Sequence, residues 1–501
     1  MKSPPATLGI DLGTTTAKAV AFADEDGREI TEVREPIERH SDADGAAEQD
    51  PDVVARAAIA VVTRAVTDAR AAGFSVARVG LSAAMHSLLP VAADGRPLGR
   101  AMLWMDRRAD EEARRLWATA TGRRLYERTG APVHPMTPLL KLAWLRTARP
   151  DVHRRAARFV SLKEWLWHGW FGEWAVDRSI ANATGLYDVH RDRWDPEALD
   201  VAGIDAERLS AIVPTTTVRA GLSATVVQAT GLRRDTPVVI GASDGVLANL
   251  GVGAIDRRRL CLTVGTSLTA RVGTDHPVTD PATRPFCYVL APGRFIVGGP
   301  SNSGGLVLDW LCRGVLGRDT ASDEMDQLLA AAATVDVGPL LCLPYVAGER
   351  APLWDAQARG VFAGLESEHG APHLVRAAVE GLALNAYWIV SGLLDLVGRP
   401  EEVVASGHVL GQPWIRQVVA DTFDLPVRDG GDRDASVTGA ALLARIATGA
   451  LTWEDARRVA ATGTSERSAP RATEVYREKY ARFRRLVDTL RGAPDGHGAL
   501  W

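Results

Sequence analysis

Two short segments share one local pattern, in which a strand rich in β-branched residues breaks at Gly-Thr-Thr or Gly-Thr-Ser and then resumes. They lie at residues 10–16 and 262–267. A glycine in such a turn lets the backbone approach an anion, and successive N–H groups and hydroxyls donate to phosphate oxygens. A single turn of this kind is typical of any hairpin. The pair predicts two clamps on the phosphates of one nucleotide, with Asp11 placed to hold a hydrated magnesium ion.

The length of the chain indicates more than one domain. A chain of 501 residues exceeds what one hydrophobic core usually organises. A Gly-Val-Gly sequence and a charged run interrupt the apolar pattern at residues 251–259, which is typical of a boundary. We therefore predict an N-terminal domain over residues 1–250, a C-terminal domain over 251–491, and a disordered tail over 492–501.

Composition excludes several classes of function. The net charge of -4 provides no basic face for nucleic acid. The chain begins without an apolar signal region, and no uninterrupted apolar stretch is long enough to cross a bilayer. The four cysteines are widely spaced, which favours buried, reduced thiols over disulfides or a zinc site. We predict a cytoplasmic protein that binds neither nucleic acid nor membrane.

The order of the expected elements indicates an α/β fold. The first Gly-Thr hairpin continues into a strand at residues 17–22, a turn at 24–27 and a third strand. Asp50 and Pro51 then begin a helix that we expect to end near Ala72, before a strand at 76–82. The second half opens in the same way, with strands at 259–264 and 268–272. Strands followed by alternating helices and strands predict layered α/β domains. Four tryptophans within residues 165–174 are interpreted as core packing.

Asp244 is the candidate catalytic residue. Within residues 238–245 an apolar strand delivers this carboxylate at its carboxyl end, just before a helix expected from near Val246. Open α/β sheets place their chemistry at the carboxyl ends of strands. The helix dipole would keep this carboxylate ionised, so that it could accept a proton from a substrate hydroxyl. A plain helix-capping aspartate is the commoner explanation of such a residue taken alone; the two phosphate clamps favour the catalytic one.

Two further polar segments fit the recognition of a polyol. Residues 82–87 follow a strand and include Met85 and His86, and residues 104–108 add Trp104 and Asp106. Polyols need a few convergent polar groups beside an apolar or aromatic wall. The loop at 298–305 carries four glycines and is expected to be a flexible nucleotide contact between a strand ending at Val297 and a helix over 306–312. Neither a Walker sequence nor a complete dinucleotide fingerprint is present.

The chain resembles the FGGY carbohydrate kinases from about residue 8 to about residue 450. Two signature regions carry the resemblance, at residues 136–145 and at 360–365 with 373–374 and 377–380. The resemblance implies two ribonuclease-H-like domains, shared with Hsp70 and actin, that close over a nucleotide cleft. Within this family, residues 85–87, 130–136, 161–164, 181–186 and 241–246 are similar to segments of gluconate kinases. The expected reaction is therefore ATP-dependent phosphorylation of D-gluconate to 6-phospho-D-gluconate.

The resemblance also implies roles for particular residues. Asp244 would be the catalytic base, and Asp11 and Asp244 would associate with Mg²⁺. The implied substrate-binding residues are Met85, His86, Trp104, Asp106, Met136 and Asp244. The implied ATP-binding residues are Gly13, Thr14, Thr15, Thr16, Lys18, Gly265, Thr266, Ser267, Gly304, Gly305, Gly407, Gly411 and Gln412. The expected partner is a small sugar acid, and relatives of this kind are often homodimers.

Three alternatives stay open at this point. A kinase of the same family could act on xylulose, ribulose or glycerol instead. A non-catalytic ATP-binding module of the actin or Hsp70 kind would use the same phosphate loops, and a dehydrogenase would need the missing fingerprint. Gluconate differs from the neutral substrates by its carboxylate, which requires a cationic partner. Lys163, Arg107 and Arg108 are the candidates for that partner.

Overall fold

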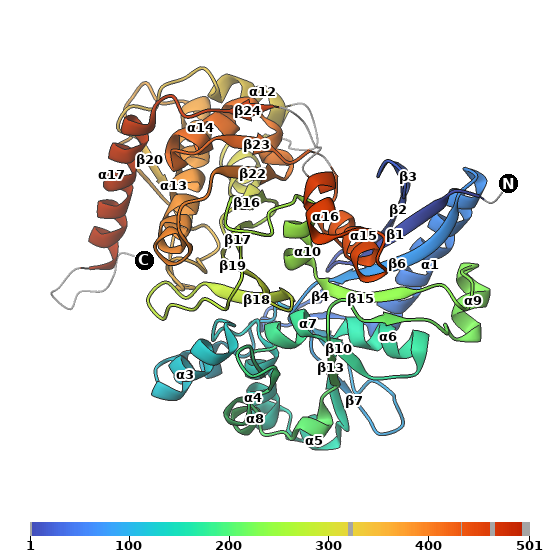
Figure 1. Ribbon diagram of the computed structural model, residues 1–501. Coiled ribbons are helices and arrows are strands. Elements are labelled where there is room, and N and C mark those ends of the chain that lie inside the picture. Colours follow the sequence, from blue (N-terminus) through green and yellow to red (C-terminus); the bar gives the residue numbers. More distant parts are fainter. Residues whose placement is uncertain (1–2, 319–323, 432, 461–465, 493–501) are drawn as a thin grey trace.

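The structure of the protein is a computed structural model, which describes residues 3–318, 324–431, 433–460 and 466–492. The tail predicted at 492–501 lies outside the described residues, apart from Gly492. Two large sheets, each flanked by helices, form the centre of the molecule, and a helical region lies below them (Figure 1).

The first sheet has six strands in the order β14-β15-β6-β1-β2-β3. Strands β15, β6 and β1 run parallel, and β1, β2 and β3 form an antiparallel meander. The strands are β1 (Pro5–Leu12), β2 (Thr16–Ala23), β3 (Glu29–Pro36), β6 (Ser75–Ala83), β14 (Val218–Arg219) and β15 (Val238–Ser243). The hairpin and the strands predicted for this half are confirmed.

The second sheet repeats this arrangement and has seven strands in the order β18-β19-β17-β16-β22-β23-β24. Here β16, β22 and β23 run parallel, and β16, β17 and β19 form the antiparallel meander. The strands are β16 (Arg259–Val264), β17 (Leu268–Thr274), β18 (Phe286–Ala291), β19 (Arg294–Ser301), β22 (Glu402–Ser406), β23 (Val427–Asp429) and β24 (Arg467–Ser468). The predicted α/β fold, built twice on one plan, is confirmed.

The region between β6 and β14 forms the lower, mostly helical part of the molecule (Figure 1). Together with two short strands before it, it contains β4 (His40–Ser41), β5 (Ala47–Gln49), β7 (Leu89–Val91), β8 (Ala101–Met102), α2 (Asp110–Trp117), α3 (Ala120–Thr129), α4 (Pro138–Ala148), α5 (Pro150–Arg155), β9 (Arg158–Val160), α6 (Leu162–Phe171), β10 (Ala175–Asp177), α7 (Arg178–Ala183), β11 (Tyr187–Asp188), β12 (Arg193–Trp194), α8 (Pro196–Ala202), η1 (Ala206–Arg208) and β13 (Ala211–Val213). As expected, the tryptophan-rich segment packs in the core: Trp167 and Trp170 of α6 are buried.

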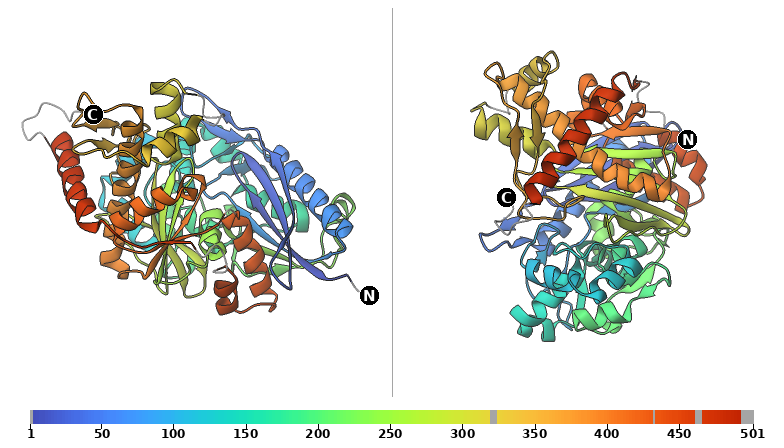
Figure 2. Two further views of the ribbon diagram at one scale, coloured as in Figure 1. Left: turned by 90° about the horizontal axis from the view of Figure 1, so that it is seen from above. Right: turned by 90° about the vertical axis from the view of Figure 1, so that its left-hand side faces the viewer.

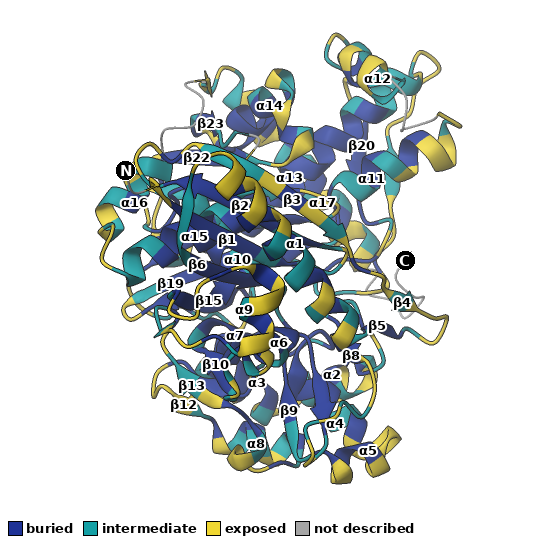
Figure 3. Ribbon diagram, turned by 90° about the vertical axis from the view of Figure 1, so that its right-hand side faces the viewer, coloured by how far each residue is buried: buried dark blue, intermediate teal, exposed yellow. Residues whose placement is uncertain are grey.

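Helices pack on both sheets (Figures 2 and 3). They are α1 (Pro51–Ala71), α9 (Ala224–Thr230), α10 (Asp244–Gly251), α11 (Gly305–Asp309), the π-helix η2 (Trp310–Val315), α12 (Glu324–Ala332), α13 (Ala371–Val397), η3 (His408–Gly411), α14 (Pro413–Phe423), α15 (Ala435–Ala447), α16 (Trp453–Ala460) and α17 (Thr473–Arg491). Helix α1 exposes its outer face, whereas α10 and α15 have no exposed residue. A further short pair consists of β20 (Leu341–Leu343) and β21 (Val361–Ala363).

Helix α1 shows how the sequence determines one boundary. Asp50 accepts hydrogen bonds from the backbone N–H groups of Asp52 and Val53, at 2.9 and 3.2 Å, and Pro51 occupies the first turn. These contacts satisfy N–H groups that the first turn of a helix leaves without partners. The predicted start and end of this helix are confirmed.

Helix α13 is long and apolar enough by composition to cross a membrane. In this structure, however, 72% of its most apolar window is buried inside the protein. It packs against β17 and β19 and against α14, so it is the core helix of the C-terminal half. All four cysteines are buried and free, as expected.

Helix α15 belongs to the C-terminal part of the sequence but packs on the first sheet, against β1, β6 and α10 (Figure 1). Glycines permit this close approach. A Cβ on Gly80 of β6 would lie 2.1 Å from the Ala440 carbonyl oxygen, and a Cβ on Gly439 would lie 1.9 Å from that of Leu247. Segments that precede residue 250 in the sequence therefore pack against a helix that follows it. The domain boundary expected at residue 250 stays a prediction.

Replacing Gly439 by alanine is expected to destabilise the protein. The added methyl group has no space against α10, and overpacking of this kind costs about 1–3 kcal/mol. Gly169 of α6 is the matched control, because a Cβ there would meet nothing within 4 Å and alanine is the better helix former by about 1 kcal/mol. Urea unfolding should show a lower midpoint for Gly439→Ala and an equal or higher one for Gly169→Ala. Equal stability of the two variants would contradict the packing of α15 described here.

Strand β18 joins the second sheet to the lower helical region. The Cys287 N–H donates to the Gly130 carbonyl at 2.8 Å, and the Val289 N–H donates to Asn182 Oδ1 at 3.0 Å. The Thr215 hydroxyl donates to the Leu290 carbonyl at 2.6 Å. These bonds hold residues from both halves of the sequence around one interior space, which contains the candidate site.

Candidate active site

Two carboxylates lie at the same edge of the first sheet. Asp11 is near the end of β1 and Asp244 directly follows β15, and both strands run parallel to β6 between them. The predicted start of the next helix is corrected. Helix α10 begins at Asp244 itself rather than near Val246, and Ser243, the last residue of β15, occupies the capping position. The Asp244 carboxylate accepts a hydrogen bond from the Gly245 N–H at 2.7 Å.

Burial and repulsion between carboxylates raise the pKa values of Asp11 and Asp244. Burial raises the pKa of Asp244 to about 6, against the opposing effects of the Gly245 hydrogen bond and the Arg271 charge. Burial, followed by the carboxylates of Asp244 and Asp434, raises the pKa of Asp11 to about 7. The Ser82 hydroxyl donates to Asp11 at 2.5 Å. A group of buried carboxylates that raise each other's pKa creates a local demand for a cation.

Five predicted substrate residues meet at one cavity of about 200 Å³, here called the inner cavity. Asp244 lines this cavity together with Ser267 of the second Gly-Thr turn. The full lining of the inner cavity comprises Met85, His86, Trp104, Met136, Asp244, Gly245, Val246, Ser267, Thr269, Arg271, Phe286, Tyr288, Pro300 and Arg350. A carboxylate, polar groups and aromatic walls thus converge in one enclosed space, as the recognition of a polyol requires.

His86 is held in one orientation and one protonation state. Its backbone has φ of 70°, a strained conformation for a non-glycine residue, and the Lys141 ammonium donates to its carbonyl at 2.5 Å. The ring Nδ1 lies 2.7 Å from the Ala183 carbonyl and therefore carries the hydrogen, which leaves Nε2 as an acceptor 3.4 Å from the Tyr288 hydroxyl. Burial and the Lys141 charge lower the pKa of His86 to about 3. The ring is neutral and presents an acceptor to the inner cavity.

A second cavity of about 450 Å³, the outer cavity, adjoins the first and shares Trp104 and Arg350 with it. Asp106, predicted to bind substrate, lines this outer cavity instead of the inner one. Its carboxylate accepts hydrogen bonds from the Arg108 guanidinium, the shortest at 2.5 Å, and from the Ala47 N–H at 3.2 Å. The role of Asp106 in binding substrate stays a prediction.

The two Gly-Thr turns are similar but differ by one residue. In the first, the Gly13 N–H donates to the Thr16 carbonyl at 3.0 Å. In the second, the Gly265 N–H donates to the Ser267 carbonyl, also at 3.0 Å. The first turn therefore has four residues between its paired strand ends and the second has three. Both lie at the ends of the central strands of their sheets, on the same side as Asp11 and Asp244.

Comparison with known proteins identifies the family. Residues 6–251 match the N-terminal domain, and residues 260–448 the C-terminal domain, of the FGGY family of carbohydrate kinases. The chain belongs to this family. It is 36% identical over 462 residues to a gluconokinase of Bacillus subtilis (strain 168), covering 90% of this chain and 89% of that protein.

Solved structures support the same family. A gluconate kinase from Lactobacillus acidophilus superimposes with a TM-score of 0.92 at 30% identity, covering 98% of this chain and 99% of that one. A ligand-bound xylulose kinase from the same organism gives a TM-score of 0.91, also at 30% identity and with the same coverage. The fold is therefore that of FGGY sugar kinases, and family membership implies ATP as the phosphoryl donor.

The glycine-rich segment at 298–305 differs from the predicted loop. Strand β19 continues through Ser301, because residues 298–301 pair with β17, and only residues 302–304 form a loop before α11. Glycine is needed here for packing: a Cβ on Gly298 would lie 2.3 Å from the Ala270 carbonyl. The predicted helix over 306–312 is observed as α11 followed by a π-helix.

Three predicted ATP-binding glycines gather around the second Gly-Thr turn of this FGGY kinase. The Gly305 N–H donates to the Gly265 carbonyl at 2.8 Å, and a Cβ on Gly304 would lie 2.6 Å from the Ser267 backbone. Gly407 has φ of 105°, and a Cβ there would lie 2.2 Å from the Val264 carbonyl. These glycines support the turn. Gly411 and Gln412 lie nearby, at the end of η3 and immediately before α14. Direct contact of any of them with nucleotide stays a prediction.

Lys18 of β2, predicted to bind ATP, forms an ion pair with Asp434, which caps the N-terminus of α15. Burial acts to raise the pKa of Asp434, but the Lys18 and Ser436 hydrogen bonds outweigh it and lower that pKa. Sequence reasoning missed Asp434. The sequence feature that could have identified Asp434 is its position three residues after Gly430-Gly431 and directly before an alanine-rich helix.

Two of the candidate partners for a substrate carboxylate are already engaged. Lys163 is buried and paired with Asp177 at 2.9 Å, below the sugar site. Arg108 pairs with Asp106 and with Glu48 at 2.5 and 2.6 Å. Arg107 is exposed and lines the outer cavity. Two arginines that sequence reasoning missed, Arg271 and Arg350, line the inner cavity instead. Arg271 could have been noticed as a charge inside an apolar strand.

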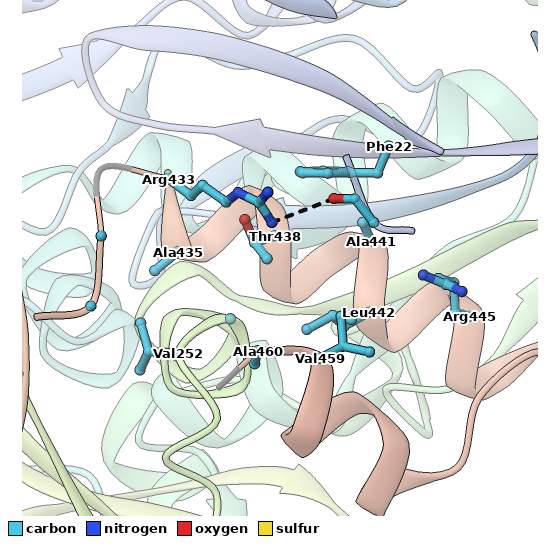
Figure 4. Close-up of a pocket in the computed structure, with 14 residues that line it drawn as sticks. Phe22, Val252, Arg433, Ala435, Thr438, Ala441, Leu442, Arg445, Val459 and Ala460 are labelled. Carbon is cyan, nitrogen blue, oxygen red and sulfur yellow. Dashed lines mark hydrogen bonds between the residues drawn. The ribbon is translucent and has the colours of Figure 1, made fainter. Parts of the chain in front are cut away.

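A third cavity, of about 320 Å³, lies between α15, α16 and the turn after β2 (Figure 4). Phe22, Leu442 and Val459 supply apolar walls, and the Arg433 guanidinium donates to the Gly27 carbonyl at its rim. None of the predicted substrate, nucleotide or metal residues lines it. The chemistry of this kinase is therefore assigned to the inner cavity.

Proposed function

We propose that the protein phosphorylates D-gluconate at its C6 hydroxyl, with ATP as donor. The observation that carries this proposal is the convergence, in one inner cavity, of Asp244, a Gly-Thr turn, an aromatic wall and buried arginines. The carboxylate supplies the base and the turn supplies phosphate donors. The arginines provide positive charge where a sugar acid has negative charge.

Asp244 acts as the base in this mechanism. Its carboxylate takes the proton of the C6 hydroxyl as that oxygen attacks the γ-phosphoryl group. With a pKa of about 6, the carboxylate is mostly ionised at neutral pH and still basic enough to assist the transfer. Another substrate hydroxyl replaces the long Tyr288 contact and donates to His86 Nε2, and Trp104 covers the carbon chain. These contacts align the hydroxyl, and alignment provides much of the rate enhancement in phosphoryl transfer.

The two Gly-Thr turns would hold the phosphates between the two halves. Asp11 and Asp244 fit Mg²⁺, because hard oxygen ligands suit this ion and the two buried carboxylates lie at the same edge of the first sheet. When bound, Mg²⁺ would neutralise charge on the transferring phosphoryl group. Among residues that the structure describes, no three acidic, histidine or cysteine side chains form a ready metal cage. Such sparse protein ligation is typical of magnesium that is bound largely through phosphates and water.

A xylulose kinase is the second candidate. The two Lactobacillus structures, named as gluconate and xylulose kinases, are equally identical to this chain, so structural similarity alone does not separate the substrates. The Bacillus gluconokinase is more similar in sequence, at 36% identity. The two buried arginines that line the inner cavity also favour an acidic substrate, because a carboxylate forms stronger, charge-assisted hydrogen bonds with them than a neutral ketose does.

A coupled ADP-release assay with Mg-ATP tests the proposal. The panel consists of gluconate, xylulose, ribulose and glycerol, with a control that contains no sugar. We expect gluconate to give the highest kcat/KM and the sugar-free rate to be small, since water must be excluded until the acceptor binds. Preferential use of a ketose would replace the proposed substrate but keep the mechanism. A rate that no sugar increases would favour a non-catalytic ATP-binding module.

A further inference from the structure

Arg271 of β17 is a buried cation with an unusual set of partners. Only 6% of the residue is exposed. Its Nε donates to Asn249 Oδ1 at 2.7 Å and its Nη2 to Thr263 Oγ1 at 2.8 Å, with Cys261 Sγ at 3.7 Å. All of these acceptors are neutral. No carboxylate within the described part of the chain forms an ion pair with Arg271.

The remaining terminal nitrogen of Arg271 faces the inner cavity. A Cβ built on Gly245 would lie 3.4 Å from Arg271 Nη1 and 3.2 Å from Met85 Cε. Gly245 is next to Asp244 in the first turn of α10, and all four residues line the inner cavity. Within the described residues, Nη1 has no hydrogen-bond acceptor. It is therefore a donor available to a molecule in the cavity.

The sheet holds this side chain in place. Arg271 of β17, Gly298 of β19 and Phe286 of β18 lie side by side across three strands. A Cβ on Gly298 would lie 2.8 Å from Arg271 Cγ and 2.9 Å from Phe286 Cζ, so the absence of a side chain there makes room for both. The two fixed hydrogen bonds and this packing orient the guanidinium before any substrate arrives. Such preorganisation reduces the entropy lost on binding.

The other cations near the site differ from Arg271 in their surroundings. Arg350 is next to the Glu349 carboxylate and lies over the Trp104 ring at 5.3 Å, at the boundary with the outer cavity. Lys163 and Arg108 are in ion pairs. Arg271 acts on Asp244 through its charge but forms neither an ion pair nor a hydrogen bond with it, so a ligand carboxylate at Nη1 would reduce the cost of burying this guanidinium.

We propose that Arg271 Nη1 binds the carboxylate of the sugar-acid substrate and so selects acids over neutral sugars. The inference rests on the proposed function, because it names the contact by which the same cavity distinguishes gluconate from a ketose or polyol. The contact is a charge-assisted hydrogen bond, which is stronger than one between neutral groups. A neutral substrate forms no charge-assisted hydrogen bond with Arg271 and gains less from this donor.

Arg271→Gln is the test variant, since glutamine keeps a hydrogen-bonding side chain but removes the charge. The acceptors are gluconate and D-glucitol, which has a hydroxymethyl group in place of the carboxylate. We expect kcat/KM for gluconate to fall about 10- to 100-fold, the effect of losing one charged hydrogen bond, while the value for glucitol changes little. Calorimetry without ATP should show the same loss in gluconate affinity. Arg56→Gln is the matched control, because it removes an exposed arginine charge on the outer face of α1, away from both cavities.

Other outcomes would overturn the proposal. An unchanged kcat/KM for gluconate would exclude the contact. Equal losses for gluconate and glucitol, together with a shifted acid limb of the pH profile, would mean that Arg271 acts on Asp244 instead. If Arg271→Gln does not fold, as judged by circular dichroism, Arg271→Lys keeps the charge and should retain the preference for acid. If the wild type does not bind gluconate at all, the proposed function is contradicted, and the inference about Arg271 fails with it.

Discussion

Replacing Asp244 by asparagine is expected to lower kcat by a factor on the order of 10² to 10⁴, the usual contribution of a general base. Asparagine has nearly the same shape, and its side-chain oxygen can still accept the Gly245 N–H bond that the carboxylate accepts in the structure. Folding and sugar binding should therefore persist while the proton acceptor is lost. Steady-state kinetics with calorimetric sugar binding measures both quantities on one preparation. Asp235→Asn, at an exposed surface aspartate, is the control.

The pH profile gives an independent check on the same residue. The pKa of Asp244 is raised to about 6, first by burial, and the ionised form is the active base. The kcat/KM of the wild type should therefore fall as the pH drops through about 7 and then about 6, the raised pKa values of Asp11 and Asp244, whereas ordinary aspartates would titrate near 4. In Asp244→Asn the lower of these two steps should be absent. An asparagine variant that turns over at the parental rate would remove Asp244 from the mechanism.

Local signals in the sequence predicted the parts of the fold that are locally determined. The Asp50-Pro51 pair specifies the start of α1 through side-chain capping and the fixed φ of proline. The Gly-Thr turns are bounded by strands that are mostly buried, and the apolar residues of these strands are visible in the sequence. Asp244 was predicted from its position after a buried strand, which is a rule about sheet edges and does not require knowledge of distant contacts.

The missed residues depend on contacts between distant segments. Arg271, Tyr288 and Arg350 come from three separate parts of the second half of the chain, and they reach His86 and Trp104 only because β18 is bonded to the lower helical region. Strand pairing also overrides local preference. Residues 298–301 look like a flexible loop by composition but extend β19, since β17 supplies hydrogen-bond partners along their whole length.

A residue with a predicted role in substrate binding can also prove to be hydrogen-bonded within the fold. Lys163 was a candidate for the substrate carboxylate, but Asp177 and the Ala242 carbonyl already accept its hydrogen bonds. A lysine in an arginine-rich sequence gives no indication of its partner. The identity of a partner depends on which strands and helices meet, and a single sequence does not specify it.

Asp11→Asn is expected to have the second large effect, a loss of activity on the order of 10²-fold or more, because a carboxylate that would help to hold Mg²⁺ is removed. The structure also predicts an opposite effect on stability. Unfolded Asp11 loses its proton near pH 4, whereas burial and neighbouring carboxylates raise its pKa in the folded protein to about 7. Between these values the folded state holds the extra proton, so stability falls as the pH rises from 4 to 7.

Above pH 7 this destabilisation is fully present, and asparagine, which carries no charge, should relieve it. At pH 8 without magnesium, Asp11→Asn should therefore unfold at a higher urea concentration than the wild type. Magnesium with a nucleotide should stabilise the wild type more than the variant, because ligands that bind only the folded state raise its stability. A variant that is less stable at pH 8 yet fully active would show that Asp11 serves the fold and not the metal.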